Sequence, residues 1–92
     1  MRERGGEGND RPRQGPHLQM NGVADGVVVY QPSRDRIHFL NHSAAVVFEF
    51  CTGSSTADEI GEAVQVAFDL PAVPTEEIEN CFAELREQGL IE

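Results

Sequence analysis

The sequence has no run of about eighteen apolar residues, so no segment of it could cross a bilayer as a helix. Its 92 residues leave room for a single domain with one hydrophobic core. The first sixteen residues also lack the apolar stretch that follows the basic start of a signal peptide. We therefore expect a cytoplasmic protein without contact to the membrane.

Large apolar side chains are missing from the N-terminal region, apart from Met1. Residues 1–16 consist mainly of glycine, proline, arginine and acidic residues. Such a composition cannot bury enough apolar surface to offset the entropy lost on ordering. The sequence therefore predicts a disordered tail over residues 1–16 and a folded domain over residues 17–92.

Positive charge is scarce beyond the tail. From residue 17 onward the chain has three arginines against thirteen acidic residues, and the whole chain has a formal net charge of −9. Nucleic-acid-binding modules obtain most of their affinity from Lys and Arg side chains that meet phosphate groups. The charge of the domain therefore argues against binding of nucleic acid.

Only two cysteines occur, and neither belongs to a close-spaced motif such as C-x-x-C. Cys51 and Cys81 each fall within an apolar helical pattern, which predicts reduced core thiols, while a disulfide between them stays open. A zinc site would require both to converge with His38 and His42, which core-facing cysteines disfavour. No nucleophile and base pair or phosphate-binding loop stands out, so we expect no enzyme, no metal and no cofactor.

Three short β-rich segments are present in the first half of the chain. Residues 23–24 and 27–30 flank Asp25-Gly26, a dipeptide typical of two-residue hairpin turns. After a stretch of turn-forming residues, a third apolar segment spans residues 37–40. These segments predict a small three-stranded antiparallel sheet.

Two helices are predicted directly after the sheet. Asn41 is a good N-cap for an apolar helix over residues 43–51, and Gly53 can close this helix in the left-handed conformation. Thr56 and Glu59 have the spacing of a capping box, which indicates the start of a second helix.

A third helix is predicted over residues 75–88, after a break that contains two prolines. Gly89 ends this helix, and Leu90-Ile91 is expected to pack back onto the core. The apolar stripe of the helix consists of Ile78, Cys81, Phe82 and Leu85. The predicted fold is α+β and similar to a winged helix-turn-helix, with the three-stranded antiparallel sheet followed by three helices.

The third predicted strand ends immediately before the first helix. If it lies at the edge of the sheet, its outer amides and carbonyls have no partner strand. An extended peptide could then bind there as an additional strand. The sequence leaves a second interpretation open, in which Arg36 and His38 only protect a short edge against aggregation.

Several short motifs occur in a characteristic order and spacing. They are LN at the end of the third strand, CTG at the end of the first helix, TADEI at the start of the second and the closing AELREQGLIE. Over residues 22–91 the chain thereby resembles the PqqD-like family, the recognition elements of ribosomally made and post-translationally modified peptides. The resemblance implies a non-catalytic protein that binds the leader segment of a precursor peptide.

The resemblance also implies where such a leader lies, namely between the third strand and the third helix. The strand residues of this site are Arg36, Ile37, His38, Phe39 and Leu40. For the helix wall we expect Glu79, Phe82, Ala83 and Arg86, with Ile78 and Leu85 beneath them. Arg36 and Arg86 could pair with carboxylates of the leader.

These observations lead to one functional hypothesis and one alternative. The protein would bind the leader by strand addition and present it to a peptide-modifying enzyme, such as a radical-SAM enzyme, in natural-product or cofactor biosynthesis. The alternative is a winged-helix adaptor or regulator that acts through protein–protein contacts. A homodimer also stays open, because small sheets with free edges can exchange strands.

Overall fold

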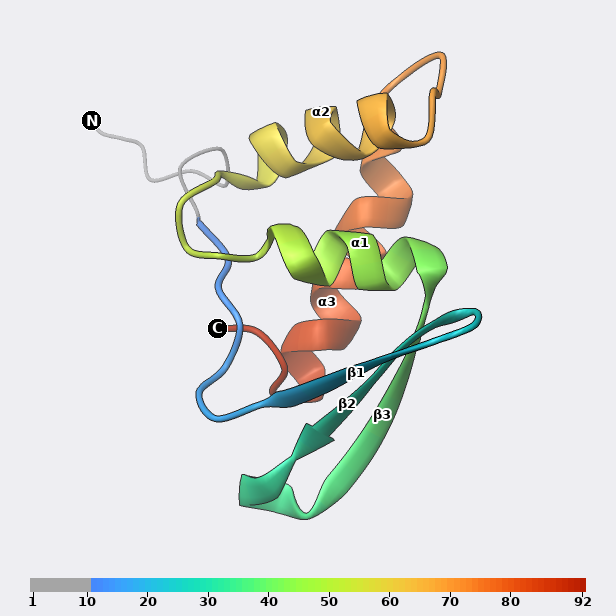
Figure 1. Cartoon of the computed structure of the whole chain (residues 1–92). Coiled ribbons are helices and arrows are strands. Elements are labelled where there is room, and N and C mark those ends of the chain that lie inside the picture. The colour runs from blue at the N-terminus through green and yellow to red at the C-terminus, as the bar shows by residue number, and fades with distance from the viewer. Residues whose placement is uncertain (1–10) are drawn as a thin grey trace, which may run out of the picture.

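The computed structural model describes residues 11–92, which form three strands followed by three helices (Figure 1). The strands build one antiparallel sheet in the order β1-β2-β3. The predicted α+β fold, with a three-stranded antiparallel sheet followed by three helices, is therefore confirmed. The winged-helix comparison stays a prediction. Within the described residues, no helix has the length and apolar character needed to cross a membrane.

The sheet consists of β1 (Gln19–Val23), β2 (Gly26–Gln31) and β3 (Arg36–Asn41). Valines dominate β2, which lies in the centre and is the most buried strand. The first strand is longer than its sequence predicted, because pairing with β2 extends it over residues of low strand propensity such as Asn21 and Gly22. All five residues of β1 are exposed.

The turn between β1 and β2 lies one residue earlier than predicted. It consists of Ala24 and Asp25, while Gly26 is the first residue of β2. The reason lies in β3, because a Cβ atom at position 26 would overlap the carbonyl oxygen of Leu40. Gly26 is therefore needed for the close approach of two strands and not for the turn itself.

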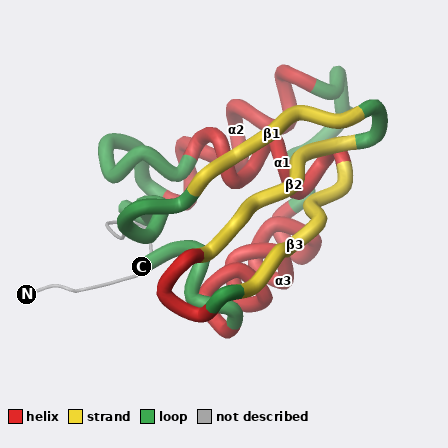
Figure 2. Tube along the Cα trace, turned by 60° about the horizontal axis from the view of Figure 1, so that its bottom comes forward, coloured by secondary structure: helices red, strands yellow, loops and turns green. Residues whose placement is uncertain are grey.

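The three helices are α1 (His42–Phe50), α2 (Ala57–Ala67) and α3 (Thr75–Glu87). All lie on the same side of the sheet, and α1 contacts β2, β3, α2 and α3 (Figures 1 and 2). Their positions agree with the predicted segments to within one or two residues, and α2 begins directly after the predicted cap Thr56.

The predicted helix caps are present. Asn41 Oδ1 accepts a hydrogen bond from the Ala44 amide at 2.9 Å. Thr56 Oγ1 accepts from the Glu59 amide at 3.1 Å, and Glu59 Oε1 accepts from the Thr56 amide at 2.8 Å, which completes the capping box. Gly53 has the left-handed φ of 85° that was expected beyond α1. Gly53 and the capping box at Thr56 thereby fix the two ends of the connection between α1 and α2.

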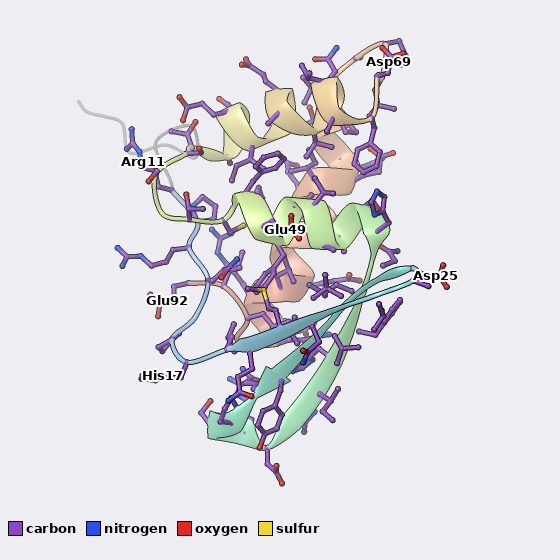
Figure 3. All side chains as sticks on the ribbon, in the orientation of Figure 1. Arg11, His17, Asp25, Glu49, Asp69 and Glu92 are labelled. Atoms are coloured by element: carbon purple, nitrogen blue, oxygen red, sulfur yellow. The ribbon has the colours of Figure 1, made fainter. Side chains whose placement is uncertain are left out.

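The hydrophobic core lies between the sheet and the helices. Charged residues such as Asp25, Glu49 and Asp69 lie outside it (Figure 3). The buried apolar residues are Val29, Leu40, Ala45, Val47, Phe48, Cys51, Ile60, Val64, Ile78, Phe82, Leu85, Leu90 and Ile91. The predicted latch after Gly89 is thus part of the core, and one face of the sheet is left uncovered by the described residues.

Residues 11–16, which we call the N-terminal segment, differ from the expected disordered tail. The amides of Gln14 and Gly15 donate to the carbonyls of Cys51 and Leu90, each at 2.9 Å, and Pro12 is fully buried. Further bonds join Gly53 N to Pro12 O, Glu92 N to Arg13 O and Gln14 Nε2 to Phe48 O. The segment orders because carbonyls at the end of α1 and in the C-terminal latch need donors. Residues 1–10 of the predicted tail lie outside the described residues.

Candidate functional site

The outer edge of β3 has no partner strand among the described residues. The register shows which main-chain groups this edge exposes. Val23 and Gly26 flank a two-residue turn and therefore form a hydrogen-bonded pair. Because alternate residues of a strand bond to opposite neighbours, Val27, Val29 and Gln31 bond to β3.

The partners of these three residues are Leu40, His38 and Arg36, which therefore direct their amides and carbonyls toward β2. The amides and carbonyls of Ile37 and Phe39 point away from the sheet. No described residue forms a hydrogen bond with them. The edge thus offers two donors and two acceptors in the spacing that an extended chain requires.

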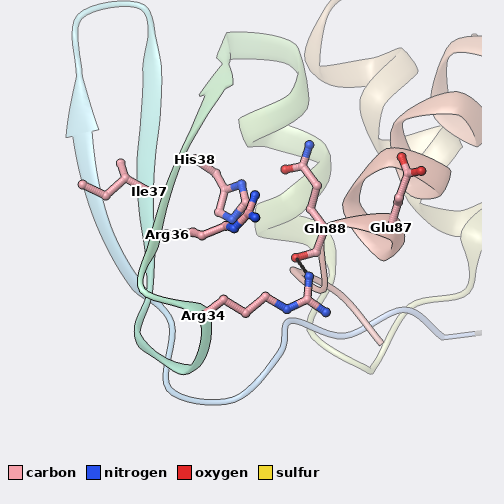
Figure 4. Close-up of a pocket in the computed structure, with 6 residues that line it drawn as sticks. All are labelled: Arg34, Arg36, Ile37, His38, Glu87 and Gln88. Carbon is pink, nitrogen blue, oxygen red and sulfur yellow. Dashed lines mark hydrogen bonds between the residues drawn. The ribbon is translucent and has the colours of Figure 1, made fainter.

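The side chains of β3 alternate between the two faces of the sheet. Ile37 and Phe39 project from the uncovered face and are 72% and 57% exposed. Arg36 and His38 project toward α3, on the opposite side of β3 from Ile37 (Figure 4). Leu40 is on the same face as these two and is buried in the core.

A groove runs between β3 and the C-terminal half of α3. Its wider end, which we call the arginine end, has a volume of about 910 Å³ (Figure 4). This end is lined by Arg34, Arg36, Ile37, His38, Glu87 and Gln88. The narrow end, of about 210 Å³, is lined by Phe39, Leu40 and Asn41 of β3, Ala44 of α1, and Cys81, Glu84, Leu85 and Gln88. Gln88 lines both ends, so the two hollows are neighbours along the gap between β3 and α3.

A buried polar bridge holds the arginine end together. Gln31 is 3% exposed, and its Nε2 donates to the carbonyls of Gln88 at 3.1 Å and Gly89 at 3.3 Å. Its Oε1 then accepts from His38 Nε2 at 3.0 Å, so this ring nitrogen must be protonated. Arg34 Nη1 donates to the Gln88 carbonyl at 3.2 Å (Figure 4). The bridge joins β2 and β3 to the end of α3 and thereby sets the width of the groove.

Replacement of Gln31 by alanine tests this bridge. We expect the free energy of unfolding to fall by about 1 kcal/mol, because the Gln88 and Gly89 carbonyls and the His38 ring lose their hydrogen bonds to a buried side chain. Urea denaturation measures the change, with Gln19→Ala on the exposed strand β1 as the matched control. Equal stability of the two variants would show that the bridge contributes nothing to the fold.

The four residues predicted for the helix wall lie away from the two hollows of the groove. Phe82 is buried in the core, and together with Glu79 it borders a separate hollow of about 260 Å³ between α2 and α3. The Arg86 guanidinium lies over the Phe82 ring at 5.9 Å, and Ala83 is exposed without lining the groove. None of these four residues is among those that line the groove, and their part in peptide binding stays a prediction.

The α3 residues that line the groove follow each other at helical spacing, namely Cys81, Glu84, Leu85 and Gln88, with Glu87 at the arginine end. Sequence reasoning named only Leu85 among them, as a supporting residue. The missed signal is that Cys81 and Leu85 belong to one side of the apolar stripe. Arg34, in the turn between β2 and β3, was also missed.

The two cysteines are free thiols. Cys51 is fully buried and donates to the Val47 carbonyl at 3.3 Å, whereas Cys81 is half-buried beside the groove. Burial raises the pKa of Cys51 to about 12, supported by Cys81 and opposed by Arg86. Burial and the Glu84 carboxylate raise the pKa of Cys81. Neither thiol is therefore an activated nucleophile at neutral pH.

The raised pKa of Cys51 gives a pH dependence of stability. The unfolded chain loses this proton near the ordinary pKa of 9.0, while the folded chain keeps it up to about 12. The stabilisation is thus complete below pH 9 and is lost as the pH rises through 12. We expect the free energy of unfolding to fall more steeply between pH 8 and about 10.5 in the native protein than in Cys51→Ala. Equal slopes would contradict the burial of this thiol.

Within residues 11–92, no group of three or more His, Cys, Asp or Glu side chains is placed to hold a metal ion. His42 instead packs edge-on against the ring of Phe68, with 5.5 Å between the ring centroids. The groove offers an open strand edge, two guanidinium groups and a lining of mixed polar and apolar side chains.

One family model, described as coenzyme PQQ synthesis protein D (PqqD), matches residues 26–91. The match begins at β2 and ends at Ile91, so it includes both walls of the groove. It leaves out β1 and the N-terminal segment. No curated protein and no solved structure matches the chain.

Proposed function

Because the chain belongs to the PqqD family, we propose that it binds the leader segment of a ribosomally made precursor peptide and presents it to a modifying enzyme. The family supports a role in PQQ biosynthesis, in which PqqD is an accessory protein and is not known as a catalyst. The leader adds a fourth strand to the sheet along β3. The modifying enzyme is of the radical-SAM class or another class that acts on peptides.

The observation that supports this proposal best is the open edge of β3. The outward amides and carbonyls of Ile37 and Phe39 match the hydrogen-bonding pattern of an added strand. Main-chain bonds of this kind supply affinity without reading the peptide sequence. Sequence selectivity then requires contacts to side chains of the peptide.

The groove is placed to make such contacts. Every second side chain of a strand added to β3 points to the same face as Arg36 and Leu40 and therefore enters the groove toward α3. Cys81, Glu84 and Gln88 meet these side chains from the helix. Binding in this manner uses no nucleophile, acid or base, which agrees with a role in delivery.

Titration with a synthetic leader tests the proposal. The probe is the leader of a precursor encoded near this gene, and the control is a peptide of the same composition in scrambled order. We expect the scrambled peptide to bind more weakly and the native leader to shift the backbone amides of residues 36–41 and of Cys81, Glu84 and Gln88. Equal binding of the two peptides, or shifts confined to α2, would contradict the proposal.

Presentation is tested separately from binding. Addition of the protein to the modifying enzyme and its full-length precursor should raise the rate of modification. A precursor without the leader should show no increase. A rate that does not respond to the protein would limit its role to binding alone.

A further inference from the structure

We propose that the peptide recognised by the groove carries an acidic side chain and, four residues away, an apolar side chain. This inference rests on the proposed strand addition to β3 and adds the chemical class of the ligand. The charged and apolar side chains at the two ends of the groove support it, together with the spacing that β3 imposes between them.

Cations gather at the arginine end. Arg34 and Arg36 both line it, although the chain has only three arginines from residue 17 onward. The Arg34 guanidinium is held in place by its bond to the Gln88 carbonyl. The Arg36 side chain has no hydrogen-bond or ion-pair partner among residues 11–92. Although the chain has a net charge of −9, the two guanidinium groups at this end favour a carboxylate there.

Guanidinium groups suit this task because they bind carboxylates with two parallel hydrogen bonds. Arg34 donates through Nη1 to a main-chain carbonyl, so its other N–H groups are available for a ligand. Glu87 lines the same end and weakens its positive charge, but the two arginines outnumber it. One carboxylate of the ligand is therefore accommodated, while a run of acids is not.

The narrow end has the opposite preference. Leu40, Ala44, Cys81 and Leu85 contribute apolar atoms to its lining, beside the polar groups of Asn41 and Gln88. Glu84 also lines it and would repel an acidic side chain there. An aliphatic or aromatic side chain of the ligand therefore fits this end better than an acidic side chain.

The spacing follows from the geometry of β3. Arg36 and Leu40 face the groove at its two ends and are separated by three residues. A strand paired with β3 keeps the same rise per residue, so its acidic and apolar residues are also separated by three others. In an antiparallel ligand the apolar residue comes first, and in a parallel ligand the acidic residue comes first.

Selection from a displayed library of random peptides tests the inference. Peptides of about twelve residues are long enough to span β3. We expect enrichment of Asp or Glu four positions from Leu, Ile, Val, Phe or Met. The order of the two residues reports the direction of the bound strand, and either order supports the inference.

One enriched peptide is then compared with its Glu→Lys or Asp→Lys version on two protein variants. Arg36→Glu should lower affinity for the acidic peptide roughly tenfold and restore affinity for the lysine peptide. The matched control is Arg11→Glu, which makes the same charge change on an exposed residue outside the groove. We expect this control to bind both peptides as the native protein does.

Two results would overturn the inference, and only the second would also overturn strand addition to β3. If enriched peptides shift the amides of Ile37 and Phe39 but lack the acidic residue, or bind Arg36→Glu unchanged, the ligand class is wrong and strand addition stands. If no enriched peptide shifts these two amides, strand addition fails as well.

Discussion

Replacement of Ile37 by proline is expected to weaken leader binding by about 2 kcal/mol, roughly thirtyfold, while the domain stays folded. The Ile37 amide points outward and has no partner in the described fold, so proline removes no bond from the ladder between β2 and β3. The same amide is one of two donors that a fourth strand would use. Calorimetric titration with the synthetic leader measures the loss.

Two control variants separate the amide from other effects. Ile37→Ala keeps the amide and removes the exposed side chain, so it should bind the leader more tightly than Ile37→Pro. His38→Pro removes an amide that bonds to β2 and should lower the free energy of unfolding much more than Ile37→Pro does. Unchanged affinity of Ile37→Pro would place the leader on another surface or in another register.

Removal of residues 1–15 is expected to lower the free energy of unfolding by about 2 to 3 kcal/mol. The deletion removes buried Pro12 and the donors that Gln14 and Gly15 provide to the carbonyls of Cys51 and Leu90. It also exposes apolar surface of the C-terminal latch, which closes the core beside α3. Urea denaturation at constant pH measures the difference.

The matched control is a shorter deletion that removes only residues 1–10 and keeps the N-terminal segment. We expect this variant to be as stable as the full chain, so the whole loss should arise between residues 11 and 15. Equal stability of both deletions would mean that the segment adds nothing to the fold. A loss already caused by the short deletion would contradict the assignment of the stabilising contacts to Pro12, Gln14 and Gly15.

The elements that local chemistry determines could be predicted from the sequence. Asn41, Thr56 and Glu59 satisfy helix amides within three residues of themselves, so the starts of α1 and α2 needed no tertiary information. The valines of β2 indicated a strand because β-branched residues favour extended structure, which is also a local property. The order of a sheet followed by three helices followed from these local patterns.

The features that depend on contacts between distant residues could not be predicted in this way. The position of the first turn depends on the carbonyl of Leu40 in another strand, which only Gly26 can accommodate. The order of the N-terminal segment depends on carbonyls at the end of α1 and in the latch, which composition does not reveal. In both cases the main chain, and not the side-chain pattern, decides the outcome.

The candidate site shows the same division. The sequence predicted that β3 could bind a peptide only if it lies at the edge of the sheet, and the strand order places it there. The rotation of α3 about its own axis could not be predicted, because an apolar stripe has two flanks and periodicity does not say which one faces β3. The flank with Glu79 and Phe82 faces α2, and the flank with Cys81 and Glu84 faces the groove.

Hydrogen exchange of individual amides in β3 tests the open edge most directly. In the free protein, we expect the amides of His38 and Leu40 to exchange slowly and those of Ile37 and Phe39 to exchange rapidly. Saturation with the leader should slow exchange at Ile37 and Phe39 and leave the other two nearly unchanged. Protection of Ile37 and Phe39 before the leader is added, or rapid exchange that persists after saturation, would contradict strand addition to β3.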